Sequence, residues 1–235
     1  MDIYADAELS FPQQGIPLPN GKMRPYIIFN MVASVDGKTT TKNGSLQGLS
    51  SQCDRRVMRR LRARVDAILV GGNTLRHDPF VPTLKPEFLG ARSQPKGVVL
   101  TKSGDLPLVH PFWQGDRQHK LVFSQTPLPE IYHQRAIVRQ FSGDLQVVLE
   151  DLYSEFGVKT MLIEGGSSLN YQFIARGWAE EFFLTISPVF VGGRDNLNIL
   201  GGDHYGLGES QLARAELVSV YHHQNEVYLR YRFLK

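Results

Sequence analysis

The amino-acid sequence predicts an α/β protein with a mostly parallel central sheet, flanking helices and an antiparallel C-terminal hairpin. Short and wholly apolar runs, typical of strands buried on both faces, alternate with segments whose apolar residues have helical spacing. Glycine-containing turns follow several of these runs, and the tail alternates apolar and polar residues. Strands that alternate with helices through one continuous body favour parallel strands joined by crossover helices.

The expected strands are short apolar runs bounded by turn residues: 26–33, 67–70, 98–100, 121–123, 136–138, 160–163 and 182–186. The tail adds a hairpin of residues 217–221 and 227–233 around a polar turn. A proline-containing loop is expected over residues 75–95, and a helix over 145–156.

Two further helices have recognisable ends. Ser51 is expected to open a helix that ends near Val65, with Asp54 three residues on as a capping-box partner. Ser167 or Ser168 is expected to cap a second helix, which stops at Gly177. Asp66, between the first helix and the next strand, is interpreted as a residue whose side chain forms hydrogen bonds at the end of a loop.

The chain divides at about residue 24. Residues 1–23 are rich in Pro, Gln and Gly without an apolar period, which predicts an arm that is flexible unless it docks on the body or on a second subunit. Residues 24–235 are expected to form a single domain, since no repeat or low-complexity segment interrupts them. The pattern leaves the role of the arm open.

Composition excludes several classes of function. Cys53 is the only cysteine, so an intrachain disulfide and a thiolate zinc site are ruled out and a reducing cytosol is expected. The start of the chain does not read as a signal peptide, and no apolar run reaches membrane-spanning length. The formal charge of +3 comes from scattered basic residues, so no nucleic-acid partner is expected. His222 and His223 have no third ligand at metal-binding spacing, so no metal site is expected.

The segment Glu164-Gly165-Gly166-Ser167-Ser168-Leu169-Asn170 is the strongest candidate for a binding site. It joins an apolar strand to a helix, and glycines there let backbone N–H groups approach an anion. A tight turn without a ligand is the alternative. Similar turns follow other strands, at 30–37, 71–78 and 101–104, and parallel strands would bring all of them to one rim that could hold a dinucleotide. None of them spells the usual G-x-G-x-x-G pattern.

Several motifs, taken in order, resemble the pyrimidine reductases of riboflavin biosynthesis. They are 25–27, 33–38, 61–71 with Thr74 and Asp78-Pro79, 163–166, 187–188 and 192–193. The resemblance implies a dihydrofolate-reductase-like fold, a cytoplasmic homodimer and an NADPH-dependent reduction of a ribosylaminopyrimidine 5′-phosphate to the ribitylamino product. The partner of the enzyme would be this small phosphorylated pyrimidine. NADH is the less favoured cofactor.

The resemblance also assigns residues to roles. NADPH-contacting positions are Val32, Thr74, Asp78, Lys102, Gly165, Gly166, Ser167, Ser168, Leu169 and Asn170. Substrate positions are Arg62, Glu164 and Ser45, and the catalytic positions are Asp78 and Glu164. Arg62 would offer a bidentate fork to the sugar phosphate, and Lys102 would meet the 2′-phosphate of NADPH.

Departures from the family pattern leave alternatives open. The loop from Thr74 to Pro79 is one residue short, so either Asp78 or His77 takes the place of the active-site carboxylate. The zinc deaminase motifs H-x-E and P-C-x-x-C are absent, so a stand-alone reductase without the deaminase domain is expected, and the order of deamination and reduction stays open. A dihydrofolate or pterin reductase of similar fold and a non-catalytic nucleotide-binding module are the alternative functions.

Overall fold

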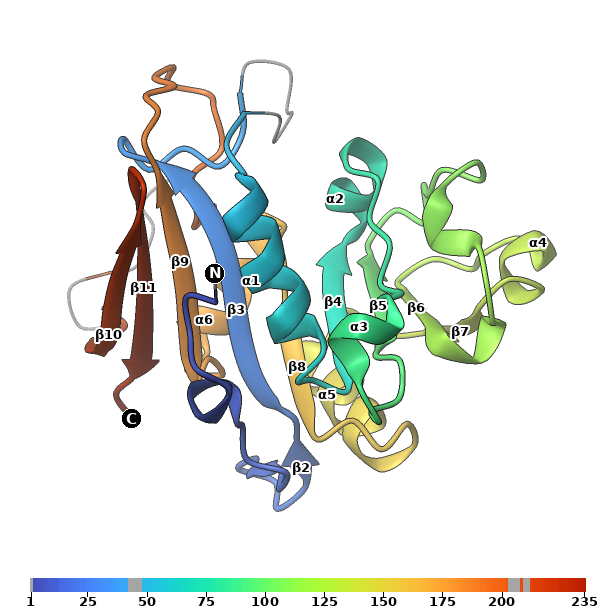
Figure 1. The fold of residues 1–235 in the computed structure, drawn as a ribbon. Coiled ribbons are helices and arrows are strands. Elements are labelled where there is room, and N and C mark those ends of the chain that lie inside the picture. The colour runs from blue at the N-terminus through green and yellow to red at the C-terminus, as the bar shows by residue number, and fades with distance from the viewer. Residues whose placement is uncertain (1, 42–47, 203–207, 209–211) are drawn as a thin grey trace. The chain divides into compact units, whose positions relative to one another are not determined.

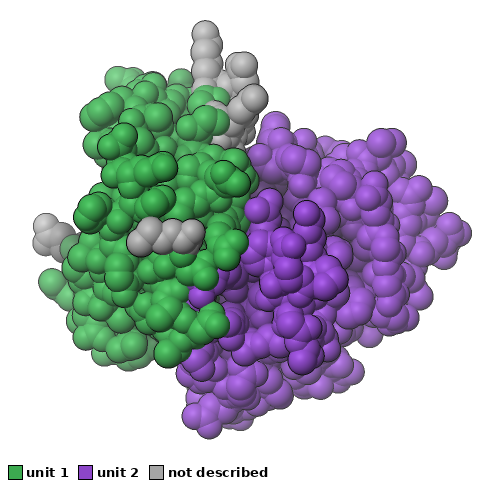
Figure 2. Space-filling model, viewed as in Figure 1, with its two compact units in different colours: residues 1–8, 27–58, 163–235 green, residues 9–26, 59–162 purple. Residues whose placement is uncertain are grey.

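A computed structural model describes residues 2–41, 48–202, 208 and 212–235 of the chain. They belong to two compact units, which Figure 2 shows in green and purple. Unit 1 comprises residues 1–8, 27–58 and 163–235, and unit 2 comprises residues 9–26 and 59–162. The segment expected to form one domain, residues 24–235, therefore contributes to both units.

Unit 1 is built on a strand order of β10-β11-β9-β3 (Figure 1). The bounds are β3 Tyr26–Ser34, β9 Glu181–Ser187, β10 Ala215–His223 and β11 Glu226–Phe233. Strand β9 pairs with β3 in parallel and with β11 in antiparallel, and β10 pairs with β11 as a hairpin. Helix α6 spans Ser167–Ala175, and helix α1, Gln52–Arg62, begins in this unit.

Unit 2 holds strands in the order β8-β4-β5-β6-β7. The bounds are β4 Ala67–Gly71, β5 Lys96–Thr101, β6 Lys120–Ser124, β7 Ile137–Gln140 and β8 Thr160–Ile163. The helices are α2 Gly72–His77, α3 Pro86–Leu89, α4 Glu130–His133 and α5 Leu145–Ser154, with 3-10 turns at Pro111–Trp113 and Arg117–His119. A short antiparallel pair, β1 Ile16–Pro17 and β2 Met23–Arg24, completes the unit, and a 3-10 turn, Asp6–Leu9, links the units.

The expected α/β class is confirmed. Strands β4 to β7 pair in parallel, as β3 and β9 do, and the C-terminal hairpin is antiparallel. Its two-residue turn places Gln224 at a φ of 53°. The apolar runs that predicted the strands are buried because parallel strands are covered on both faces. The expectation of a loop over residues 75–95 is only partly correct. The second half of α2 and the whole of α3 lie within this range.

Helix α1 begins as the capping pattern predicts. The Asp54 N–H donates to Ser51 Oγ at 3.0 Å, so Ser51 is the N-cap residue. The Asp54 carboxylate accepts from Ser50 Oγ at 2.6 Å, and its burial raises its pKa. The helix ends at Arg62 and not near Val65, because the next residues close a turn in which the Arg64 N–H donates to Leu61 O at 2.9 Å.

The first residues of the chain are docked, which is one of the two states expected for this segment. In unit 1, Tyr4 is only 1% exposed, and its ring meets the edges of Phe183 and Tyr221 at centroid distances of 5.2 and 5.5 Å. Tyr221 in turn donates from its hydroxyl to Glu8 Oε1 at 2.9 Å. In unit 2, Phe11 is buried and stacks on Tyr26.

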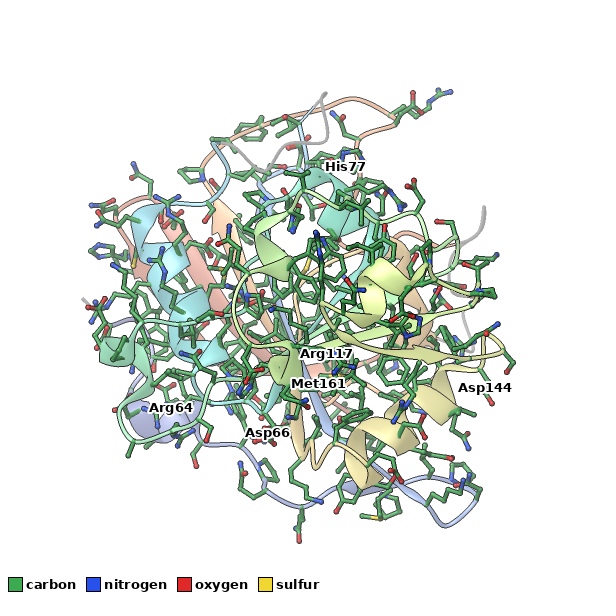
Figure 3. All side chains as sticks on the ribbon, turned by 90° about the vertical axis from the view of Figure 1, so that its right-hand side faces the viewer. Arg64, Asp66, His77, Arg117, Asp144 and Met161 are labelled. Atoms are coloured by element: carbon green, nitrogen blue, oxygen red, sulfur yellow. The ribbon has the colours of Figure 1, made fainter. Side chains whose placement is uncertain are left out.

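Asp66 fixes the starts of three strands of unit 2. Its Oδ2 accepts from the N–H groups of Lys159 and Thr160 at 2.8 Å, beside β8, and its carbonyl accepts from the Lys96 N–H of β5 at 2.8 Å. Figure 3 shows Asp66 and His77 at opposite ends of the β4–α2 segment. The interpretation of Asp66 as a loop-end hydrogen bonder is confirmed, and the contacts align the strands so that β4 and β5 end together.

Glu150 predicts a pH dependence of stability. It accepts hydrogen bonds from Lys22 Nζ at 2.7 Å, from Asn20 Nδ2 at 2.6 Å and from Gln146 Nε2 at 2.9 Å. The bond from Lys22 is the main reason that the pKa of this carboxyl is lowered from 4.5 to about 2. Because the folded-state pKa is depressed, the stabilisation is present above the unfolded pKa and is lost as the pH falls from 4.5 towards 2.

We therefore expect Glu150→Gln to unfold at lower urea concentration than the parent protein at pH 7, and at the same concentration near pH 2. Urea unfolding at both pH values measures the difference. Glu155→Gln, an exposed residue at the end of the same helix, is the control and should show no such difference. A stability gap for Glu150→Gln that is as wide at pH 2 as at pH 7 would contradict the assignment.

Candidate functional site

The turn after β8 has the geometry of an anion site. Gly165 and Gly166 have φ angles of 125° and 95°, which side-chain-bearing residues rarely adopt. Gly166 is the N-cap of α6, and the first helical hydrogen bond runs from the Asn170 N–H to Gly166 O at 2.9 Å. The N–H groups of the residues between them point out of the helix end. Those N–H groups and the helix dipole favour a bound phosphate.

The prediction that Ser167 or Ser168 caps this helix is wrong. Gly166 occupies the N-cap position, and no side chain caps the helix there. A serine cap needs the serine itself at the N-cap with extended dihedrals, whereas here Ser167 is already the first helical residue. The predicted stop is confirmed, since the helix ends just before Gly177, whose φ is 66°.

The other candidate residues of unit 1 differ in how they are placed. Val32 is half-buried on β3, in register with Thr185 of β9, and Glu164 is half-buried at the start of the turn. Leu169 and Asn170 are buried in the first turns of α6. The Asn170 side chain faces into the unit and donates to Ile199 O at 2.9 Å, so it acts on the protein itself.

Within unit 2, the carboxyl ends of β4 and β5 lie side by side, because Gly71 pairs with Leu100 in the parallel register. A Cβ on Gly72 would lie 3.1 Å from Thr101 Oγ1, so the turn after β4 packs directly on the end of β5. Thr74 is half-buried on α2, and Lys102 is exposed immediately after β5. Two of the predicted strand-end turns are therefore neighbours in this unit.

Asp78 is the C-cap residue of α2. Its N–H donates to Thr74 O at 2.9 Å, and its carbonyl accepts from His110 Nε2 at 2.9 Å. The carboxyl is half-buried, and this burial raises its pKa, opposed by the charge of His77. His77, labelled in Figure 3, is exposed. Of the two candidates for the active-site acid, Asp78 is therefore the one with a half-buried side chain.

Arg62 is 9% exposed at the end of α1. It donates from Nη1 to Val81 O at 2.9 Å, and its Cζ lies 5.4 Å from the centroid of the Phe80 ring. The guanidinium is thus held in place by the segment that follows Asp78. Ser45, the other substrate candidate beside Glu164, lies outside the described residues.

The sequence placed residues 33–38 and 192–193 among the family motifs but did not predict that the two segments contact each other. Asp36 accepts hydrogen bonds from the Val191 N–H at 3.0 Å, from Ser34 Oγ at 2.7 Å and from the Gly192 N–H at 2.7 Å. The bond from Val191 contributes most to lowering the pKa of Asp36 to about 2. Asp36-Gly37 and Gly192-Gly193 are both visible as turn signals, but nothing in the pattern pairs them across the chain.

Among the residues that the structure describes, no group of three or more His, Cys, Asp or Glu side chains could hold a metal ion. Within the same residues, the helices are too short or too polar to cross a membrane.

These features define an α/β protein with a glycine-lined turn at a helix N-terminus that is suited to bind a phosphate group. The model of the RibD C-terminal domain family matches residues 25–229. The chain therefore belongs to the RibD C-terminal domain family.

Individual relatives agree with this membership. The 2,5-diamino-6-ribosylamino-4(3H)-pyrimidinone 5′-phosphate reductase of Methanothermobacter thermautotrophicus is 31% identical over 77% of this chain and 86% of its own. A pyrimidine reductase-like protein from Corynebacterium diphtheriae has a TM-score of 0.74 at 24% identity, covering 90% of this chain and 92% of its own. RibD of Acinetobacter baumannii has a TM-score of 0.76 at 22% identity, and this chain spans 58% of its length and is covered to 90%. The predicted reductase-like fold is confirmed by these structures.

Proposed function

We propose that the chain is an oxidoreductase that reduces a ribosylaminopyrimidine 5′-phosphate to the ribitylamino product with NADPH, as a step of riboflavin biosynthesis. The observation that carries this proposal is the 31% identity, over 77% of the chain, to a relative named as such a reductase. The turn at Glu164–Asn170 supports it, because its glycine dihedrals and helix N-terminus suit a dinucleotide pyrophosphate.

The described residues fit a nicotinamide dinucleotide. Gly165 and Gly166 have no side chains that could cover the N–H groups of the α6 N-terminus, and glycine readily adopts the positive φ angles found there. When bound, the cofactor supplies a hydride to the C1′ carbon of the ring-opened imine form of the substrate. The residues proposed to hold it are Val32, Thr74, Asp78, Lys102, Gly165, Gly166, Ser167, Ser168, Leu169 and Asn170. Asn170 would contribute indirectly, because its N–H already donates to Gly166 O and its side chain donates to Ile199 O. The exposed ammonium of Lys102 would select NADPH over NADH through the 2′-phosphate.

The substrate is proposed to contact Arg62, Glu164 and Ser45. Arg62 matches the sugar phosphate, because a guanidinium forms two parallel hydrogen bonds to phosphate oxygens. Its contacts with Val81 and Phe80 hold the planar group before substrate arrives, which reduces the entropy lost on binding. The Glu164 carboxylate accepts hydrogen bonds from the amino groups of the pyrimidine or the hydroxyls of the ribose.

Asp78 is proposed to act at the reacting nitrogen, and Glu164 is proposed to orient the substrate. Because burial raises the pKa of Asp78, its carboxyl can hold a proton closer to neutral pH and pass it to the imine nitrogen. The carboxylate that remains stabilises the positive charge that develops there.

A steady-state assay of NADPH oxidation tests the proposal. The substrates compared are the diaminopyrimidine ribosylamino 5′-phosphate, its deaminated counterpart and dihydrofolate. Turnover of one of the first two supports the proposal and shows whether deamination precedes reduction. Turnover of dihydrofolate alone favours the related reductase function, and NADPH binding without any turnover favours a nucleotide-binding module.

We also propose that the enzyme is a homodimer that buries the outer hairpin strand. Val227, Leu229 and Tyr231 alternate along β11 and are half-buried. The exposed apolar side chains lie instead on the edge strand β10, where Leu217 and Val220 are 53% and 55% exposed. An apolar edge strand of this length favours association over exposure to water.

Val220→Asp is therefore expected to convert a dimer into a monomer at micromolar concentration, because a charge would be buried in the proposed interface. Light scattering at physiological salt measures the mass of the parent and the variant. Val109→Asp, at a fully solvated position of unit 2, should leave the mass unchanged. A monomeric parent protein, or a Val220→Asp variant that stays dimeric, would rule out this interface.

A further inference from the structure

The segment Ile199–Gly202 lies directly against the first turn of α6. The Gly201 N–H donates to Ser167 O at 3.0 Å. A Cβ on Gly201 would lie 3.0 Å from Ser167 Oγ and 3.1 Å from the backbone nitrogen of Ser168. A Cβ on Gly202 would meet the ring of Tyr171 at 2.7 Å. Gly201 thus lies against the backbone of the turn that is proposed to bind the dinucleotide, and Gly202 lies against a side chain one helical turn further along α6.

Asn170 ties the same segment to α6 from inside the unit. Its side chain is 0% exposed and donates from Nδ2 to Ile199 O at 2.9 Å, with Met31 Sδ at 3.5 Å. Its Oδ1 has no hydrogen-bond partner among the described residues. A buried amide with an unpaired oxygen destabilises a fold compared with an apolar side chain of the same size, so stability alone does not account for an asparagine here.

The chain just before this segment is anchored to residues that follow β3. Leu197 O accepts from the Thr39 N–H at 2.8 Å and from Thr39 Oγ1 at 3.1 Å. Lys38 and Asn198 form an isolated antiparallel bridge. The chain is therefore held just before the segment, so the contact of the segment with α6 can fix the position of the helix end.

We infer that Asn170 and Gly201 are positioning residues that orient the N–H groups of the first α6 turn toward the cofactor's pyrophosphate. The inference rests on the proposed function of that turn. The Ser167 carbonyl and the Ser168 N–H belong to one planar peptide unit, so the bond from Gly201 to that carbonyl sets the direction of the N–H. Asn170 acts one step further away, by holding the carbonyl of Ile199 and with it the chain that carries Gly201.

The test compares Gly201→Ala and Asn170→Leu with the parent protein in direct binding titrations. Gly201 does not have a positive φ, so alanine there adds a steric contact with Ser167 and Ser168 and not backbone strain. Leucine has the same number and branching of side-chain heavy atoms as asparagine, although its methyl groups are bulkier, and it cannot donate to Ile199. Gly15→Ala is the matched control, since its Cβ would lie 2.2 Å from Tyr153 Cε2, in unit 2, and it also lacks a positive φ.

Both variants are expected to raise the Kd for NADPH about tenfold, the scale of a sub-ångström misplacement of a binding group. Their affinity for adenosine 2′-phosphate, which has no pyrophosphate, should be unchanged, and kcat at saturating NADPH should stay within about twofold of the parent value in Gly201→Ala. Hydrogen exchange should show that NADPH protects the Ser168 amide in the parent and protects it less in both variants. Gly15→Ala should lower the melting temperature and leave the Kd unchanged.

The result that overturns the inference is parent-like NADPH affinity and parent-like Ser168 protection in both variants. Equal losses of affinity for NADPH and adenosine 2′-phosphate would also overturn it, because the effect would not reach the pyrophosphate. Gly166→Val separates this failure from failure of the proposed function. If Gly166→Val loses NADPH while the two variants keep it, only the positioning role is wrong; if Gly166→Val also binds like the parent, the cofactor turn itself is misassigned.

Discussion

Gly166→Val should raise the Kd for NADPH by about 100-fold or more, which is roughly 2.7 kcal/mol of binding free energy. Gly166 has a φ of 95°, and a β-branched residue can hold that conformation only at a cost of about 1 to 3 kcal/mol. Relief of this strain would rotate the peptide groups at the start of α6 away from the anion, and the new side chain would take up space beside them. Isothermal titration with NADPH measures the effect.

Gly177→Val is the matched control for this prediction. Gly177 follows the other end of the same helix, has a φ of 66° and has open space around its Cβ position. The substitution therefore introduces comparable backbone strain without touching the α6 N-terminus. We expect it to lower the melting temperature and to keep the parent's affinity for NADPH. A folded Gly166→Val protein that binds NADPH as tightly as Gly177→Val would show that the dinucleotide binds elsewhere.

Arg62→Ala should lower kcat/KM for the ribosylaminopyrimidine phosphate by about tenfold to several hundredfold. This is the scale expected when a charged hydrogen bond of roughly 1.5 to 3 kcal/mol is removed. The Kd for NADPH should hardly change, because the proposed partner of Arg62 is the sugar phosphate. A substrate analogue without the phosphate should be almost indifferent to the substitution, since the interaction is already missing. Steady-state kinetics with both substrates provide the comparison.

Arg59→Ala controls for the structural part of the Arg62 effect. Arg59 lies on the same helix and its Cζ is 5.9 Å from the Phe88 ring centroid, so its removal also deletes a cation–π contact. Arg62 makes a similar contact with Phe80 and an added hydrogen bond to Val81. A loss of kcat/KM in Arg59→Ala as large as in Arg62→Ala would indicate a packing effect. Equal losses for Arg62→Ala with and without the substrate phosphate would eliminate the phosphate role.

The sequence by itself determined the features that depend on neighbouring residues. Apolar runs such as 67–70 and 160–163 predicted buried strands because a strand covered on both faces needs apolar residues at every position. Ser51 predicted the start of α1 because its hydroxyl caps an N–H only three residues away. Alternating residues in the tail predicted the hairpin, whose register depends on the turn between its strands.

Only the tertiary structure decided how these elements form a site. The α6 N-terminus begins at Gly166 and not at a serine cap, and Gly201, 35 positions further along the chain, packs against it. The acidity of Asp78 depends on burial, which is set by whatever surrounds the folded loop. The Asn170 side chain faces inward and donates to the Ile199 carbonyl, and because this partner is 29 positions away in sequence, the spacing along the chain does not predict the contact. A linear pattern records spacing along the chain, whereas dihedral choice, desolvation and long-range hydrogen bonds arise from contacts that form only on folding.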